Sequence, residues 1–312
     1  ITILVPTRRA ARSLHAEILE RLGGRAAILP AIRPIGDVDE EDQILEAAAD
    51  DPDGRLVLPE AISRLDRLLV LTRLTLAWGR AVRRELLSLS EDDRVLVPAS
   101  AADAFHLAGD LARLIDDIET TGIAWEKLET LVPEDLARYW QISLDFLRIV
   151  GVHWPAFLSE RGLADPSVRR DHLLRAAAAR LAASPPRGLV IAAGSTGSIP
   201  AVAELLSVIA HLPNGAVVMP GIDTELDANG WMAIGGLAAP ARSAPGHPQY
   251  GLKQLIETIG VGRDEIVTLG AMTPDMAERV RLVSDAMRPA ETTEAWATAP
   301  PVVASAIGDV AL

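Results

Sequence analysis

Residues 1–19, with the sequence ITILVPTRRAARSLHAEIL, predict a β-strand that leads through a short turn into an α-helix. Ile1, Ile3 and Val5 are β-branched, and such residues favour a buried strand. Thr7 is a candidate N-cap, and apolar residues recur at helical spacing after it. A strand that runs directly into a helix is typical of an α/β sheet, where ligands bind beyond the carboxyl ends of the strands.

The turn after this first strand is basic, because Arg8, Arg9 and Arg12 follow Thr7 within five residues. Arginine side chains beside helix N–H groups favour an anionic ligand such as a phosphate. The alternative is an ordinary strand–helix unit whose arginines are solvated. Residues 1–35 hold six arginines against two glutamates in a chain of net charge −13, so we expect a local basic patch on an acidic protein.

Composition restricts the class of protein. With 312 residues and 49% apolar content, the chain can bury a large core in two or more subdomains. The absence of cysteine excludes disulfides, thiolate zinc sites and cysteine-ligated iron–sulfur clusters within this chain, and it is consistent with a cytoplasmic location. Charges and prolines interrupt the long apolar runs, so no membrane partner is expected. The sequence begins inside a strand and without Met, which indicates a piece of a longer protein.

Residues 59–183 predict an all-helical insertion between strands, because apolar residues recur there at three- and four-residue spacing. The predicted helices are 61–87, 101–120, 133–150, 153–161 and 166–183. Ser100 and Asp165 are candidate helix caps. The tryptophans expected to anchor the core of this block are Trp125, Trp140 and Trp154.

Further strands are predicted on both sides of the insertion, at 26–35, 188–193 and 215–219, with a possible additional strand at 265–269. The remaining elements are an acidic connection at 37–53, which is an exposed loop or a short helix, then helices at 201–211, 250–259 and 274–287, and a linker at 289–301. This order predicts an α/β domain with a parallel sheet, formed by residues 1–58 and 184–312. Residues 224–312 are expected to be partly irregular and to lead to a following domain.

The loop after the strand at 188–193 has the sequence GSTGSIP. Its glycines and hydroxyl groups, next to a helix N-terminus, are typical of a phosphate-binding turn. The candidate binding residues are Gly194, Ser195, Thr196 and Ser198. The loop lacks the lysine of a Walker A motif and the spacing of G-x-G-x-x-G and G-x-S-x-G motifs, so a Ser195 hydrolase has little support. The alternative is a capped strand-to-helix turn.

The sequence predicts no metal ligands and no catalytic residues in this chain. Its six histidines show no zinc-binding spacing. Asp116, Asp117 and Glu119 lie close together in the sequence, but on a helix rich in Leu and Ala we expect them to form a solvated face.

Several segments resemble a known family. Residues 3–18, ILVPTRRAARSLHAEI, resemble motif Ia of superfamily 1 DNA helicases of the UvrD and RecB type, and residues 188–206 and 217–223 occupy the places of motifs II and III. The phrases VPTRRAARSL, VPEDL followed by WQISLDFLRIV, IAAGSTGSIPA and HPQYGLK resemble the alphaproteobacterial AddB family, over nearly the whole chain. AddB is one subunit of the AddAB helicase–nuclease, which processes double-strand breaks for recombination.

The resemblance implies a RecA-like sheet with a large inserted helical subdomain of the 1B type, but without ATP chemistry. Motif II would present an Asp-Glu pair, where this chain has Ala-Ala-Gly at 192–194, and Ile222 separates Gly221 from Asp223 in motif III. Without a magnesium ligand and a phosphate-binding lysine, phosphoryl transfer lacks its usual electrostatic parts. ATP and magnesium are then expected on the AddA partner, and an iron–sulfur cluster only in an AddB region beyond this sequence.

The resemblance and the basic turn together predict a protein that binds single-stranded or double-stranded DNA and docks on an AddA-like helicase–nuclease subunit. The expected contacts to the DNA backbone are Thr7, Arg8, Arg9 and Arg33, with the loop from Gly194 to Ser198 as a second candidate. One alternative is a purely structural scaffold for AddA that does not touch DNA. The other is an independent small-molecule α/β enzyme that uses the loop at 194–200.

Overall fold

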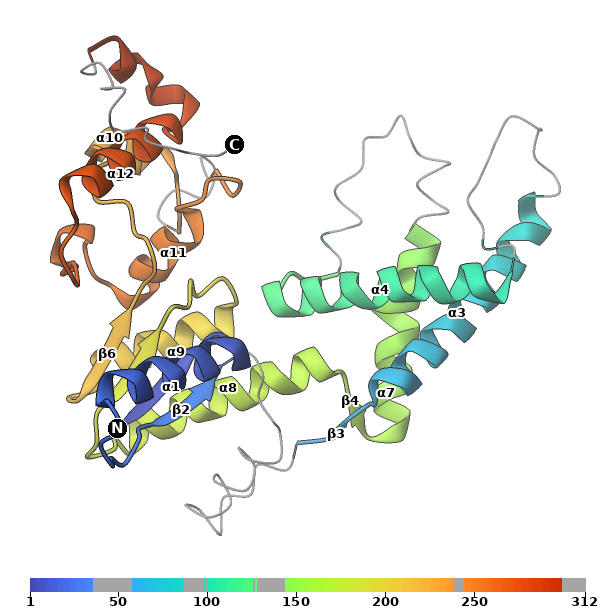
Figure 1. Cartoon of the computed structure of the whole chain (residues 1–312). Helices are drawn as coiled ribbons and strands as arrows, with labels where there is room; N and C mark the ends of the chain where they lie inside the picture. The colour runs from blue at the N-terminus through green and yellow to red at the C-terminus, as the bar shows by residue number, and fades with distance from the viewer. Residues whose placement is uncertain are drawn as a thin grey trace. The chain divides into compact units, whose positions relative to one another are not determined.

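The computed structural model describes residues 1–35, 58–86, 98, 100–125, 127, 144–237 and 244–298. The chain divides into two compact units, one formed by Ile1–Val38 with Arg175–Leu312 and the other by Asp39–Leu174 (Figure 1). The helix α8 (Pro166–Ala183) continues across this division, so the helical unit differs at both ends from the insertion predicted at 59–183. The acidic segment, Trp140 and most of the helix predicted at 133–150 lie outside the described residues.

A four-stranded parallel sheet in the order β2–β1–β5–β6 forms the centre of the first unit. Its strands are β1 (Thr2–Val5), β2 (Ala31–Pro34), β5 (Val190–Ala193) and β6 (Gly215–Val218). The register aligns Leu4 of β1 with Arg33 on one side and with Ala192 on the other. The protein therefore has an α/β fold with a parallel sheet, as the alternation of strand and helix patterns predicted.

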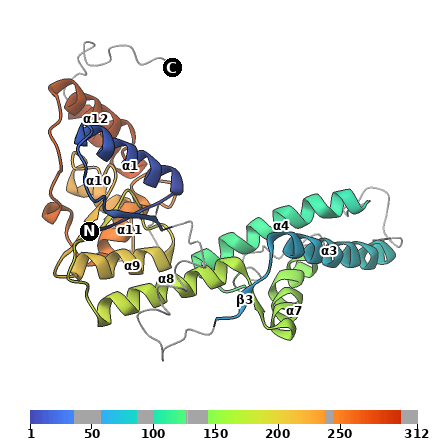
Figure 2. The same ribbon diagram turned by 60° about the horizontal axis from the view of Figure 1, so that its bottom comes forward.

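The two strand–helix–strand units of this sheet run in opposite directions. From β1 the chain passes through α1 (Arg8–Leu22) to β2, whereas from β5 it passes through α9 (Pro200–His211) to β6. Right-handed crossovers in opposite directions place their helices on opposite faces of a sheet. Accordingly, α1 lies on one face and α9 on the other, beside α8 (Figure 1 and Figure 2). The change of direction falls between β1 and β5.

The core of the first unit lies around α9, which buries Ala201, Leu206 and Ile209 completely. Against α9 packs α11 (Tyr250–Ile259), with the buried apolar residues Leu252, Leu255, Ile256 and Ile259. The remaining elements are α10 (Ala228–Ala233), α12 (Pro274–Ala286) and the 3₁₀ helices Arg263–Glu265 and Ala290–Thr298.

Two sequence predictions for the carboxyl-terminal third are wrong. The strand predicted at 265–269 is absent: Val267 and Leu269 are 80% and 71% exposed, and no described strand pairs with them. The linker predicted at 289–301 contains the 3₁₀ helix Ala290–Thr298. The indole Nε1 of Trp296 donates a hydrogen bond to the carbonyl of Asp285, 2.9 Å away, which ties this segment to α12.

The second unit is helical, with α3 (Arg64–Leu86), α4 (Ala101–Thr121), a π-helical turn (Ile149–His153) and α7 (Trp154–Arg161). Ser100 caps α4 as predicted, since its hydroxyl accepts a hydrogen bond from the Asp103 N–H at 3.1 Å. The short parallel pair β3 (Glu60–Ala61) and β4 (Leu163–Ala164) was not predicted from the sequence. None of the described helices is long and apolar enough to cross a membrane.

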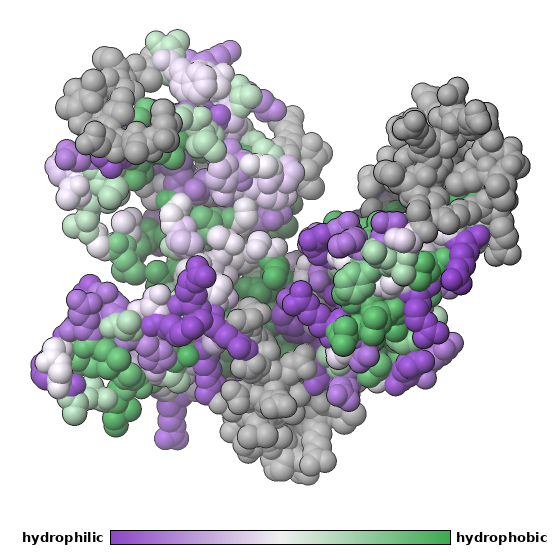
Figure 3. Space-filling view, turned by 45° about the vertical axis from the view of Figure 1, so that its right-hand side comes forward, coloured by the Kyte–Doolittle hydropathy of each residue, from purple (hydrophilic) through white to green (hydrophobic). Residues whose placement is uncertain are grey.

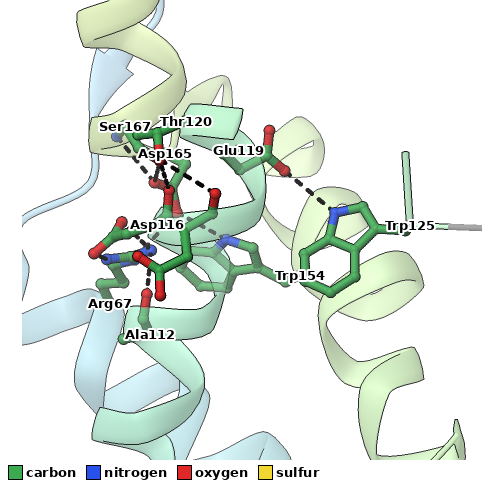
Figure 4. Close-up of polar contacts among 10 residues, drawn as sticks. Arg67, Ala112, Asp116, Glu119, Thr120, Trp125, Trp154, Asp165 and Ser167 are labelled. Atoms are coloured by element: carbon green, nitrogen blue, oxygen red, sulfur yellow. Dashed lines mark hydrogen bonds and ion pairs between the residues drawn. The ribbon is translucent and has the colours of Figure 1, made fainter. Parts of the chain in front are cut away.

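A buried polar network joins α3, α4, α7 and α8 in the second unit (Figure 4). Arg67 on α3 is 7% exposed, and its guanidinium lies 3.1 Å from Asp165 and 2.9 Å from Asp116. Asp165 also accepts hydrogen bonds from the indole Nε1 of Trp154 and from the backbone N–H and hydroxyl of Ser167. Asp116, expected on a solvated face, is therefore a partner of a buried arginine.

We expect Asp165→Ala to lower the free energy of unfolding by about 3–5 kcal/mol, because it leaves the Trp154 and Ser167 donors buried without their acceptor and removes one of the two carboxylates paired with the buried Arg67. Urea unfolding followed by circular dichroism measures this change. The control is Asp110→Ala, which breaks the exposed Asp110–Arg113 pair and should cost less than about 1 kcal/mol. Equal costs for both substitutions would contradict a structural role of the network.

Candidate anion-binding site

The two loops selected from the sequence meet at the point where the sheet changes direction. Pro6 and Thr7 follow β1, and Gly194 follows β5, which is the neighbouring strand. A Cβ atom added to Gly194 would lie only 3.5 Å from Cδ of Pro6, so the two turns touch. In open α/β sheets, the carboxyl edge at such a switch point is the place where ligands bind.

Thr7 forms the N-cap of α1, as the sequence predicted. Its backbone is extended, and its hydroxyl oxygen accepts a hydrogen bond from the Ala10 N–H at 3.1 Å. Arg8 and Arg9 occupy the first turn of the helix and are exposed, and this turn contains no acidic residue. The N-terminal end of a helix carries partial positive charge, so each arginine there is unfavourable by about 0.3–1 kcal/mol. A bound anion would remove this repulsion.

Arg33 lies on β2, directly beside Leu4 of β1 in the register, and is exposed. It therefore lies one strand away from the Thr7 turn, near the carboxyl end of the sheet. The structure thus brings all four residues expected to contact a DNA backbone to adjacent strand ends of one unit.

The loop after β5 owes its shape to two glycines with positive φ, Gly194 at +82° and Gly197 at +62°. The Ser195 hydroxyl oxygen accepts a hydrogen bond from the Gly197 N–H at 3.3 Å, whereas Thr196 and Ser198 are exposed. The following helix α9 begins after Ile199 without a side-chain cap. Its first backbone N–H groups therefore lack the acceptor that Thr7 provides for α1, which suits an external anion.

Gly197→Ala should disrupt this loop, since a Cβ atom there would lie 2.7 Å from Cδ1 of Leu255 and the backbone φ is left-handed. We expect a loss of about 2–4 kcal/mol of stability, the sum of backbone strain and overpacking. Gly122 has a similar φ of +68° but no atom within 4 Å of an added Cβ, so Gly122→Ala should cost only the strain, about 1–2 kcal/mol. Thermal unfolding of both variants measures the difference, and equal costs would refute the packing contribution.

A hollow of about 350 Å³ adjoins this loop between α9 and α11. It is lined by Gly197, Ser198, Pro200, Ala203, Glu204, Ser207, Val208, Leu237, Gln254 and Thr258. Most of its polar groups already have partners: Ser207 donates to the Thr258 carbonyl, and Gln254 donates to the Tyr250 hydroxyl. The Glu204 carboxylate, which also lines it, lies 3.4 Å from Nε of Arg175, so these contacts do not favour the small-molecule enzyme.

The described residues supply no catalytic constellation around the loop. No group of three metal-ligating side chains occurs among them. The ring contacts recorded for His15, His211 and His247 are all to backbone atoms, so none of these rings is placed to activate Ser195. The hydroxyl groups and backbone N–H groups of the loop are suited to holding an anion.

The loop after β6 contains residues that sequence reasoning missed. The Gln249 side chain donates to the Gly221 carbonyl at 3.0 Å and accepts from the Asp223 N–H at 2.9 Å, so it ties this loop to the start of α11. The Asp223 carboxylate accepts from the N–H groups of Glu225 and Leu226. In the sequence, Gln249 was noted only as part of the phrase HPQYGLK. No sequence pattern indicated its contacts with Gly221 and Asp223.

Asp227 caps α10 near this loop. The Gly230 N–H and then the Arg288 guanidinium, both hydrogen-bonded to the carboxylate, lower the pKa of Asp227 below its ordinary value. A lowered carboxyl pKa stabilises the folded state above the unfolded pKa, and this contribution is lost as the pH falls through the folded pKa. The cap of α10 is therefore weakened only in acid.

No family model, no curated protein and no solved structure matches this chain.

Proposed function

We propose that this protein is a RecA-like, helicase-related domain without ATPase activity, which binds the phosphate backbone of single-stranded DNA and docks on an AddA-like motor subunit in double-strand break repair. The observation that supports this proposal is the meeting of the Thr7 turn and the loop from Gly194 to Ser198 at the switch point of the sheet. Two helix N-termini, exposed arginines and hydroxyl groups there suit phosphate groups.

Binding without hydrolysis is the chemistry that these residues favour. After β5, where an active helicase of this type would carry its acidic pair, the chain has Ala192, Ala193 and Gly194. A backbone N–H, a hydroxyl and arginine side chains can hold a phosphodiester, but they cannot position magnesium and water for phosphoryl transfer. Such contacts fix the position of a DNA strand and do not read its sequence.

Replacing Arg8 and Arg9 together by Ala should weaken binding of a single-stranded oligonucleotide. Each lost phosphate contact should also reduce the slope of log K against log salt concentration by about 0.7. Fluorescence anisotropy over a series of salt concentrations, on the assembled heterodimer, measures both quantities.

The matched control is Arg21→Ala with Arg25→Ala, which removes the same charge at the other end of α1, where both residues are exposed. The control should change affinity and salt slope much less. Equal effects of the two double variants would show that net charge, and not a contact at the Thr7 turn, determines DNA affinity.

A second function, a scaffold that docks on the motor subunit, is favoured by exposed apolar residues of the helical unit. Hydrophobic side chains gather on the surface of this unit (Figure 3). The large ones are Leu65, Leu69, Phe105, Ile123 and Val152, each between 41% and 64% exposed. Leu65 and Leu69 are one helical turn apart on α3 and thus lie on the same face. Exposed apolar groups of this kind mark protein-binding surfaces when they are contiguous.

Leu65→Ser with Leu69→Ser should weaken assembly with the motor subunit by about tenfold or more, because docking would no longer bury these side chains. Analytical ultracentrifugation of the mixed subunits measures this, with Val267→Ser on the other unit as a control. Unchanged assembly would show that α3 is not part of the docking surface. It would not bear on the proposed DNA binding by the sheet.

A further inference from the structure

A second cationic cluster lies beyond the carboxyl end of β6, on residues that the proposed function does not use. The indole ring of Trp231 on α10 has the guanidinium carbon of Arg263 4.8 Å from its centroid and the Lys253 Nζ 5.5 Å from it. Arg263 also donates a hydrogen bond to the carbonyl of Asp223, in the loop that follows β6. Two positive charges thus lie against one aromatic ring, next to the loop that follows β6.

These two cations lack a paired carboxylate among the described residues. No described acid lies within 4.0 Å of the nitrogen atoms of Lys253 or Arg263, whose recorded polar partners are the carbonyls of Trp231 and Asp223. Two of the acids close in sequence have backbone partners elsewhere: Glu257 accepts from the Leu237 N–H, and Glu265 accepts from the Gly262 N–H. The cluster therefore has no direct ion pair within the described residues, and the charge of Glu257 acts on Lys253 only at longer range.

The side chains of the cluster are also held in place by hydrogen bonds and partly buried. Lys253 is only 7% exposed, and its ammonium group donates to the Trp231 carbonyl at 2.7 Å. Burial lowers the pKa of Lys253; the charge of Glu257 opposes this shift, and the charge of Arg263 adds to it. Arg263 is half-buried, and its guanidinium has five donors of which one is used on Asp223. Its other donors have no hydrogen-bond partner among the described residues, so an incoming anion can accept from them.

We infer that Arg263, with Lys253 behind it on Trp231, forms a second binding site for a phosphate group at this edge of the protein. Arg263 makes the direct contact, because a guanidinium can bind two phosphate oxygens at once. Lys253 acts as a buried charge at short range, and Trp231 positions both cations. The phosphate group belongs either to a DNA strand or to a small phosphorylated ligand.

A purely structural role is the competing explanation, in which Lys253 satisfies a carbonyl of α10 and Arg263 ties down the loop after β6. The two explanations differ in what phosphate does. Substitution of a structural cation changes stability alone, whereas substitution at a binding site also removes the response of Trp231 to phosphate.

The test is a titration of the ¹⁵N-labelled protein with inorganic phosphate at constant ionic strength, followed by the indole N–H resonance of Trp231, assigned with Trp231→Phe. The wild type should show a saturable shift. Arg263→Gln, which keeps a donor for the Asp223 carbonyl, should raise the apparent Kd about tenfold or more, and Arg263→Lys should restore part of the affinity. Lys253→Met should weaken binding as well.

Arg281→Ala is the matched control, because it removes an exposed arginine of α12 and should leave the titration unchanged. Absence of a saturable shift in the wild type, or equal Kd values for wild type and Arg263→Gln, would overturn the inference. The double variant Arg8→Ala and Arg9→Ala should leave the Trp231 titration intact, so this inference and the proposed DNA contact can fail separately.

A second titration with oligothymidine identifies the source of the phosphate. If Arg263→Gln weakens both ligands, the site lies on a DNA path. If it weakens inorganic phosphate alone, the site takes a small phosphorylated ligand. Both outcomes support a phosphate site.

Discussion

The parallel backbone ladder between β1 and β5 is the constraint on which the α/β unit depends. It pairs Leu4 with Ala192, residues that are separated by the whole helical unit. Closing so long a loop has an entropic cost that grows only slowly with its length, which makes a large insertion at this place tolerable. The ladder also joins two crossovers of opposite direction, so the edge between β1 and β5 becomes the switch point where the Thr7 turn and the Gly194 loop touch.

The helical unit depends on a different kind of interaction. Its core is apolar around Trp154, but the relative placement of α3, α4, α7 and α8 is specified by Arg67 and Asp165, a buried ion pair in which each partner has further hydrogen bonds. Such a pair contributes little net stability compared with apolar packing, yet removing one partner is costly. It therefore selects one arrangement of the four helices over others that would bury similar apolar area.

Clustered positive charge is the feature shared by both proposed sites of the α/β unit. Arg8 and Arg9 lie at the positive end of α1, where arginine is disfavoured, and Lys253 and Arg263 share one indole ring. In a protein of net charge −13 these arrangements are exceptions to the overall balance. An anionic ligand at either site, as proposed above, would be attracted by this charge.

The sequence by itself determined the described α-helices except α10, the strands around residues 2–5, 190–193 and 215–218, and the cap at Thr7, since periodicity and capping are local properties. The strand predicted at 265–269 is wrong, because a segment with local β propensity forms no strand when no described strand lies beside it to pair with. The sequence also did not indicate the contacts of Lys253 and Arg263 or the Arg67–Asp165 ion pair. Only the tertiary structure decided the strand order, the contact between the two candidate loops and the sharing of Trp231 by two cations. These depend on contacts between residues distant in sequence, which no local pattern encodes.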